Sequence, residues 1–137
     1  MHSAEHLLNQ TMVRMFGCSR CFSAHINRKK SKCDYRFDRM ISGEEISEIE
    51  LRMNQIIKAD LPVTLESLSQ EKAQESYNID RVPEGDELQE LRIVHMGDYD
   101  SCPCIGTHVN STAEIGAFRI ISADFNDGVL RIRFKLS

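Results

Sequence analysis

The feature that most constrains this chain is a pair of histidines at its start that is matched by a cysteine and a histidine near its other end. His2 and His6 are four residues apart, and so are Cys104 and His108. On a helix, residues at that spacing share one face, about 5–6 Å apart at Cβ, so two imidazoles can reach one ion. Each residue alone is more often solvated or packed, but the joint pattern favours a metal site. Because zinc favours nitrogen and sulfur ligands, we predict that these four residues bind Zn²⁺.

Length and composition indicate one globular domain. The chain has 137 residues, of which 41% are hydrophobic and 28% charged, and we expect a single domain over residues 1–137. We find no apolar run long enough to span a bilayer and no signal-peptide layout, so we expect a cytoplasmic protein with no membrane partner. Without an export signal, the five cysteines are better interpreted as thiols or metal ligands than as a disulfide framework.

The charge distribution allows only local contact with nucleic acid. A net charge of −4 argues against a broad basic coat, and we expect no DNA partner. Basic residues nevertheless gather in one short stretch and on alternating positions near the end, namely Arg28, Lys29, Lys30 and Lys32, and then Arg131, Arg133 and Lys135. A charged turn is often only a solvated tip. The functional alternative is contact with phosphates through counterion release.

Apolar periodicity predicts two helices and an intervening hairpin. Residues 3–16 have helical spacing and end at Gly17, a plausible left-handed stop. Strands are predicted at 22–27 and 32–37, on either side of the basic turn. Ser42 and Glu45 form a capping box before an apolar stripe that continues to Ala59, which predicts the second helix.

The second half of the chain predicts mainly strands. We expect strands at 62–68, 91–96, 115–125 and 129–136, a short helix at 69–76, a loop at 78–87, and a turn-rich approach to the second ligand pair through 102–104. Asn126-Asp127-Gly128 is a strong hairpin signal between the last two strands. The result is an α+β fold with a mostly antiparallel sheet and helices packed on one face.

Several motifs, taken together and in this order, resemble the editing domain of alanyl-tRNA synthetases. They are His2-Ser3-Ala4-Glu5-His6-Leu7-Leu8, Tyr35-Arg36-Phe37-Asp38, Leu61-Pro62-Val63, Cys104-Ile105-Gly106-Thr107-His108-Val109 and Ala113-Glu114-Ile115-Gly116-Ala117-Phe118-Arg119-Ile120. This second additional domain also occurs in threonyl-tRNA synthetases and in freestanding AlaX-type proteins. The chain looks like the small freestanding form, which would deacylate mischarged tRNA in trans without ATP.

The resemblance implies a function and a site. The substrate would be an aminoacyl-tRNA ester, most simply seryl-tRNA-Ala, bound by its acceptor end. Zinc would be held by His2, His6, Cys104 and His108, with His2 the looser ligand because helix ends fray. Thr107 could hydrogen-bond the substrate, although a turn residue can equally bond its own backbone, and Glu5 could orient a water. Recognition of serine over alanine requires a polar pocket lining.

The chain also departs from the family at the expected pocket. Where alanyl editing domains commonly carry Gln-x-Gly-Ser, this sequence has Cys21-Phe22-Ser23-Ala24, so a thiol replaces the glutamine at the candidate substrate-binding position Cys21. Cys-Gly-Gly-Thr-His has likewise become Cys104-Ile105-Gly106-Thr107-His108. These changes leave open a different amino acid, weaker activity, or a zinc-binding and tRNA-acceptor-binding module that does not hydrolyse.

Two other patterns compete for the same residues. Cys18-x-x-Cys21 with Cys102-Pro103-Cys104 could form a four-thiolate zinc site, which would leave both histidine pairs unexplained. His2-Ser3-Ala4-Glu5-His6 also satisfies the H-x-x-E-H pattern of a small zinc peptidase, with Glu5 as general base. That class does not predict Cys104 and His108, so the editing interpretation accounts for more of the chain.

Overall fold

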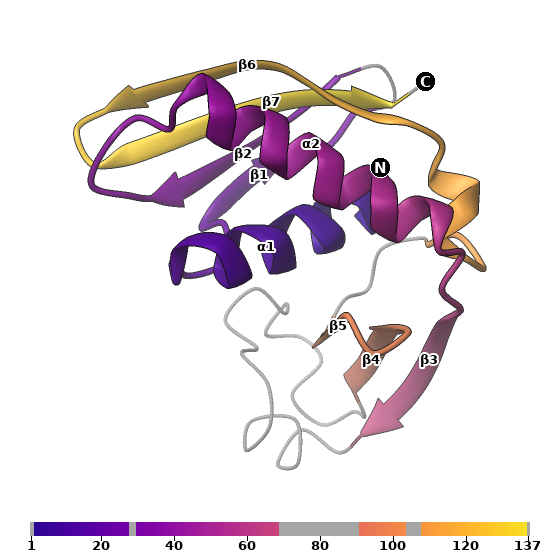
Figure 1. Ribbon diagram of the computed structural model, residues 1–137. Helices are drawn as coiled ribbons and strands as arrows, with labels where there is room; N and C mark the ends of the chain where they lie inside the picture. Colours follow the sequence, from indigo (N-terminus) through magenta and orange to yellow (C-terminus); the bar gives the residue numbers. More distant parts are fainter. Residues whose placement is uncertain (1, 28–29, 69–90, 104–107, 137) are drawn as a thin grey trace.

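The computed structural model describes residues 2–27, 30–68, 91–103 and 108–136, with the side chains of residues 2, 67, 68, 91 and 103 left out. Within these ranges the chain forms two α-helices, seven β-strands and one short 3₁₀-helix (Figure 1). In chain order they are α1 (His2–Phe16), β1 (Ser23–His25), β2 (Ser31–Arg36), α2 (Gly43–Lys58), β3 (Val63–Leu68), β4 (Leu91–Met96), β5 (Asp100–Pro103), η2 (Thr112–Ile115), β6 (Phe118–Asn126) and β7 (Val129–Leu136).

The larger sheet has four antiparallel strands in the order β1-β2-β7-β6. Strict alternation builds its central strand β7, where Leu130, Ile132 and Phe134 are buried and the residues between them face outward. The β6–β7 connection is a two-residue turn in which Asp127 and Gly128 both have positive φ, 50° and 76°. This is the geometry that the Asn-Asp-Gly signal predicts, so the hairpin is confirmed.

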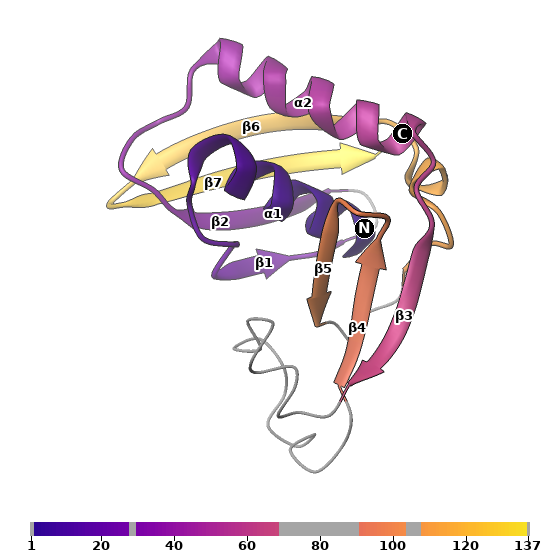
Figure 2. The ribbon, with the colours of Figure 1, turned by 60° about the horizontal axis from the view of Figure 1, so that its bottom comes forward.

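Both helices cover the same face of this sheet, as the two views together show (Figures 1 and 2). In α1, Ala4, Leu7, Leu8 and Met12 are buried in the common core. The helix ends where Gly17, at φ 69°, donates its N–H to the carbonyl of Val13 at 2.9 Å, which confirms the predicted stop.

The second helix begins and packs as its sequence predicts. The Ser42 side chain accepts from the backbone N–H of Glu45, and the Glu45 carboxylate accepts from the backbone N–H of Ser42 in return. Ile49, Met53 and Ile57 then form the buried stripe that faces the core. The α+β class with helices on one face of an antiparallel sheet is therefore confirmed.

A smaller antiparallel sheet, β3-β4-β5, stands beside the first (Figure 2). We expected one sheet, and the structure has two. Val94 and Met96 of β4 are buried in the same core as α1, so one face of the small sheet is directed at that helix. The segment approaching Cys104, which we expected to be turn-rich, contains strand β5, whose edge position tolerates Pro103.

The strand expected to start at Ile115 begins instead at Phe118. Ser111 and Glu114 form a second capping box that starts the 3₁₀-helix η2, and Gly116 leaves it at φ 88°, so residues 112–116 cannot continue a strand. The helix predicted at 69–76 and the loop predicted at 78–87 lie outside the described residues. None of the described helices is long and apolar enough to cross a membrane.

Candidate metal and substrate site

The fold brings together one histidine from each predicted ligand pair. His6 lies on the buried face of α1 with 4% of its surface exposed, and His108 lies in the segment before η2. Their ring centroids are 4.7 Å apart, with the ring planes at 76°. Two residues separated by about a hundred positions along the chain therefore stand edge to face.

Each imidazole directs its Nδ1 atom at a protein group. The Nδ1 of His6 lies 3.5 Å from a carboxylate oxygen of Asp100, and the Nδ1 of His108 lies 3.0 Å from the hydroxyl of Ser3. Ser3 also accepts the backbone N–H of Val109 at 3.2 Å. Metal-binding histidines usually donate one ring N–H to such partners and bind the ion through the other nitrogen, so ligation here would use Nε2 of both rings.

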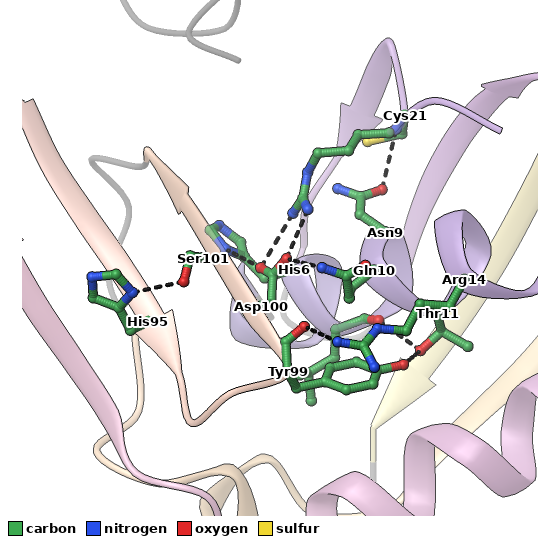
Figure 3. A network of polar contacts seen from close by, with 12 residues as sticks. His6, Asn9, Gln10, Thr11, Arg14, Cys21, His95, Tyr99, Asp100 and Ser101 are labelled. Carbon is green, nitrogen blue, oxygen red and sulfur yellow. Dashed lines mark hydrogen bonds and ion pairs between the residues drawn. The ribbon is translucent and has the colours of Figure 1, made fainter. Parts of the chain in front are cut away.

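Asp100 is the centre of a buried polar network beside His6 (Figure 3). Its carboxylate accepts from Arg20 at 2.8 Å and from Gln10 at 3.1 Å, and its side chain is fully buried. Burial alone would raise the pKa of Asp100, but the contact with His6 and the charge of Arg20 outweigh that effect and lower it. Asp100 therefore stays ionised, and its carboxylate faces the Nδ1 atom of His6 at 3.5 Å.

Of the four predicted zinc ligands, the structure describes the side chains of two. The side chain of His2 and all of Cys104 lie outside the described residues, as does the candidate substrate-binding residue Thr107. Among the described residues, no group of three His, Cys, Asp or Glu side chains gathers closely enough to hold a metal. The described residues include Cys18, Cys21 and Cys102, three of the four thiols that the four-thiolate alternative needs, and these three do not gather at one point.

The donor chemistry present is what zinc ligation needs. Zinc binds neutral imidazoles, and the low-pKa carboxylate of Asp100 and the hydroxyl of Ser3 are suitable partners for the two Nδ1–H groups. For His108 this arrangement requires that Ser3 accept the Nδ1–H, which its two lone pairs allow while it also accepts from Val109. His6 and His108 therefore fit a zinc site that His2 and Cys104 would complete.

The candidate residues Glu5 and Cys21 meet on the buried side of α1. The Cys21 thiol donates to a carboxylate oxygen of Glu5 at 3.6 Å, and the two residues are only 2% and 3% exposed. Asn9 accepts from the Cys21 backbone N–H at 3.2 Å and from the Tyr35 hydroxyl at 2.8 Å. Burial raises the pKa of Tyr35 well above its ordinary value, so Tyr35 remains a neutral donor. Glu5, Asn9 and Cys21 therefore form a buried polar wall beside α1, with each residue at most 3% exposed.

The predicted basic turn is only partly described. Arg28 and Lys29 lie outside the described residues, Lys30 is exposed just before β2, and Lys32 lies on the outward face of β2. Sequence reasoning missed Ser3, Arg20 and Asp100. Asp100 and Arg20 are 80 positions apart, so no local pattern marks them as a pair. The one signal in the sequence was an acidic residue at a position of a strand that is buried.

Comparison with known proteins relates this chain to two aminoacyl-tRNA synthetase families. Residues 91–133, which contain the second ligand pair, match the sequence model of the threonyl and alanyl tRNA synthetase second additional domain. The matched residues include β4, β5, η2, β6 and most of β7 of this chain.

Similarity to alanine–tRNA ligases extends over nearly the whole chain. The ligase of Francisella tularensis subsp. novicida is 37% identical over 134 residues, which cover 96% of this chain and 15% of the ligase. The ligases of Methanopyrus kandleri and Halorubrum lacusprofundi are each 33% identical, over 97% of this chain and 15% of theirs. The chain spans about 15% of the length of these relatives, so the similarity concerns one part of them.

Proposed function

We propose that this domain hydrolyses the ester bond of mischarged aminoacyl-tRNA, with seryl-tRNA-Ala as the first candidate substrate, in a pocket that binds zinc. The observation that carries the proposal is the edge-to-face pair of His6 and His108, each backed at Nδ1 by a protein group, in a chain related to alanine–tRNA ligases. The pair occupies the positions where the resemblance to editing domains expects metal ligands.

The chemistry asks little more than positioning. In the reaction, water attacks the ester carbonyl, the bond from that carbon to the ribose oxygen breaks, and the ribose oxygen takes a proton to leave tRNA and a released amino acid. Zinc held by His6, His108 and their two predicted partners would supply a Lewis acid for this step. The protein must hold the ester in place and exclude competing substrates.

The wall formed by Glu5, Asn9 and Cys21 supports selection of a hydroxylated amino acid. Buried polar groups favour a substrate that hydrogen-bonds to them and disfavour alanine, which would leave them unpaired. In this proposal Glu5 accepts a hydrogen bond from the substrate's hydroxyl or ammonium group. Arg28, Lys29, Lys30 and Lys32 would contact the phosphates of the acceptor end, and Thr107 would hydrogen-bond the ester.

One observation favours a second function, binding without hydrolysis. The Cys21 thiol occupies the place of the family glutamine and already donates to Glu5, so both groups are engaged within the wall. If neither turns toward a substrate, the domain would bind zinc and the acceptor end of tRNA without cleaving the ester.

A deacylation assay separates the two functions. The purified 137-residue chain is incubated with tRNA-Ala charged with serine, glycine or alanine and with tRNA-Thr charged with serine, with and without a chelator, and amino acid release is followed. We expect release from seryl-tRNA-Ala to exceed that from alanyl-tRNA-Ala. Release at the buffer rate from every substrate would refute hydrolysis, whereas hairpin RNA binding by the same inactive protein would support the binding function.

The role of the metal is tested with a matched pair of variants. His6→Ala removes a proposed ligand, and His25→Ala removes an exposed histidine of β1 as a control. We expect His6→Ala to lower both the zinc content of the purified protein and the deacylation rate, with His25→Ala unchanged in both. Full zinc content in folded His6→Ala would rule out the proposed site.

A further inference from the structure

Positive charge is concentrated on the strands of the four-stranded sheet. The chain as a whole is acidic, with 17 lysines and arginines against 21 aspartates and glutamates. β1, β2, β6 and β7 together hold six of those basic residues and only two of the acidic ones. The protein has a net charge of −4, but the strands of this sheet together carry a net positive charge.

Strand register gathers four of these cations at one end of the sheet. Lys32 of β2 is opposite Arg133 of β7, and Lys135 of β7 is opposite Arg119 of β6. Side chains directly across an antiparallel pair lie about 4.5–5.5 Å apart at Cβ, and alternate residues of β7 share a face. We call this group, Lys32, Arg119, Arg133 and Lys135, the basic strand end.

The basic strand end faces away from the core. On β7 the intervening residues Ile132 and Phe134 are fully buried, which directs Arg133 and Lys135 to the opposite face from the helices. Arg119 and Lys135 are both exposed. Lys32 and Arg133 are half-buried, and α1 and α2 cover the other face of the sheet (Figures 1 and 2).

The two acidic residues on these strands are already engaged by arginines. Asp34 forms a bidentate pair with Arg131 at 2.8 and 3.0 Å, and Asp124 lies 2.6 Å from Arg133. Lys32, Arg119 and Lys135 form no ion pair among the described residues. The charge of the basic strand end is therefore largely uncompensated and available to an external anion.

Cations outnumber aromatic groups at the basic strand end. None of the outward-facing residues of β2, β6 and β7 is Phe, Tyr or Trp, and the exposed Phe22 lies with Arg36 at the other end of β2, while His25 of β1 is opposite Lys32. Closely spaced cations with a single imidazole beside them favour the phosphate backbone of a duplex over stacked single-stranded bases. The basic strand end would contact the backbone and carry no base readout of its own.

The location of the basic strand end fits the proposed site. The arrowhead of β7, where Lys135 lies, and the start of α1, which carries the first ligand pair, are at the same end of the molecule in both views (Figures 1 and 2). Because the two lie on opposite faces of the sheet, the single-stranded terminus of a duplex bound here would have to pass around this end of the sheet to reach the start of α1.

We infer that the basic strand end binds the phosphate backbone of an RNA duplex, as the acceptor stem of a tRNA presents it; this rests on the proposed function. The surface would hold the stem while the site beside His6 receives the aminoacylated end. It extends the contact area from the basic turn onto the open face of the sheet, which includes Arg119 and Lys135.

The test measures salt-dependent binding of an uncharged, fluorescently labelled acceptor-stem hairpin of tRNA-Ala. The double variant Arg119→Gln with Lys135→Gln is compared with Arg52→Gln with Lys58→Gln, which removes the same residue types from the exposed side of α2. Between about 50 and 200 mM salt, removing two phosphate contacts should reduce the slope of log K against log salt by about 1 to 2. The α2 pair should leave the slope unchanged. Thermal unfolding of all proteins establishes that they are folded.

Three outcomes would overturn the inference. The first is an equal salt-dependence slope for both double variants. The second is a larger loss of affinity of the Arg119→Gln with Lys135→Gln variant for a single-stranded RNA of the same sequence than for the hairpin. The third is a loss of its affinity for anionic lipid vesicles while its affinity for the hairpin is unchanged. Failure of the proposed function is distinguishable from failure of this inference. If no ester is cleaved but hairpin binding depends on Arg119 and Lys135, the RNA-binding surface is supported and hydrolysis is refuted. If seryl-tRNA-Ala is cleaved but hairpin binding is the same without Arg119 and Lys135, hydrolysis is supported and the RNA-binding surface is refuted.

Discussion

Asp100 shows how a single side chain connects the polar interior to the candidate metal site. It is fully buried on β5 and makes three contacts, with the guanidinium of Arg20, the amide of Gln10 and the imidazole of His6. A buried carboxylate with one cation beside it is costly on its own, and such pairs are weak evidence for stability. We interpret the position of Asp100 as orienting, because its carboxylate faces the Nδ1 atom of His6 at 3.5 Å.

At this scale we predict that Asp100→Asn weakens zinc binding by about 10–100-fold, because an amide is a poorer acceptor for the His6 Nδ1–H. Affinity is measured by competition with a chromophoric chelator and by the absorption of the cobalt-substituted protein, neither of which depends on activity. Asp34→Asn is the matched control, since Asp34 also pairs with an arginine but does not contact a histidine. Equal zinc affinity in Asp100→Asn and wild type would show that Asp100 has no part in positioning His6.

The sequence singles out His6 and His108 but not the residues that contact them. The two histidines are recognisable because each belongs to an i,i+4 pair, which is a local pattern. Ser3, Arg20 and Asp100 are not, since each is defined by a partner about 80 to 105 positions away. The sequence also could not decide between Cys21 as a metal ligand and Cys21 as part of the substrate site. Only the structure shows that its thiol contacts Glu5.

At the scale of elements, α2 is held at its start by an exposed carboxylate with an unusual pKa. Hydrogen bonds from Arg39, at 2.7 and 2.8 Å, and from the Ser42 backbone lower the pKa of Glu45 from its ordinary 4.5 to about 2. A carboxyl group whose pKa is depressed by folding stabilises the protein above the ordinary value, and the contribution is lost as pH falls through the folded value. The relevant range here is pH 4.5 down to 2.

We therefore predict that Glu45→Gln destabilises the protein at neutral pH and that the difference from wild type shrinks as pH falls from 4.5 to 2. Glutamine keeps one acceptor oxygen for the capping-box hydrogen bond but loses the charge and the second hydrogen bond from Arg39. Urea midpoints from circular dichroism at a series of pH values give the comparison. Glu48→Gln, which removes an exposed i,i+4 partner of Arg52, is the control. A difference that stays constant down to pH 2 would contradict the assignment.

One buried hydroxyl joins the end of α2 to η2, beside a backbone hydrogen bond from Thr112 to the carbonyl of Leu61 at 2.9 Å. Thr112 is fully buried, and its Oγ1 accepts from the backbone N–H of Leu61 at 2.8 Å and donates to the carbonyl of Ile56 at 2.8 Å. Thr112→Val keeps the shape but leaves both backbone groups unsatisfied, and we expect a loss of about 1–3 kcal/mol in the free energy of unfolding. Urea denaturation measures it, with Thr64→Val on the exposed side of β3 as control. A loss no larger than that of the control would be inconsistent with this role.

Element prediction succeeded where periodicity was local and failed where pairing was not. The helices, the β6–β7 turn and strands β3 and β4 follow from apolar spacing, caps and turn residues. The sequence could not predict that β3, β4 and β5 form a separate sheet. The alternation of apolar and polar residues indicates which face of a strand is buried, but it does not indicate which strand lies next to it. Strand β5 was not predicted because proline usually indicates a turn. Pro103 is tolerated in this strand because β5 lies at the edge of its sheet.

At the scale of the whole molecule, α1 is the joint between the two sheets. Its apolar face packs in the core of the large sheet, while its polar residues bond to the end of the small one. Thr11 and Tyr99 share a hydroxyl hydrogen bond, Arg14 donates to the Tyr99 carbonyl at 2.9 Å, and Gln10 donates to Asp100. The same helix carries His6, so the candidate site lies where the two sheets and the helix meet (Figure 3).

This placement predicts that zinc stabilises the folded chain. An ion held by His6 and His108 would connect α1 to the segment before η2, and a ligand that binds only the folded state adds about 2.7 kcal/mol at a concentration a hundredfold above its dissociation constant. We expect zinc to raise the midpoint of thermal unfolding and a chelator to reverse the rise, as followed by circular dichroism in the presence of a thiol reductant. Magnesium, which prefers oxygen ligands, should have no effect. His6→Ala should abolish the zinc-dependent rise and His25→Ala should retain it; an equal rise in both variants would place zinc elsewhere on the protein.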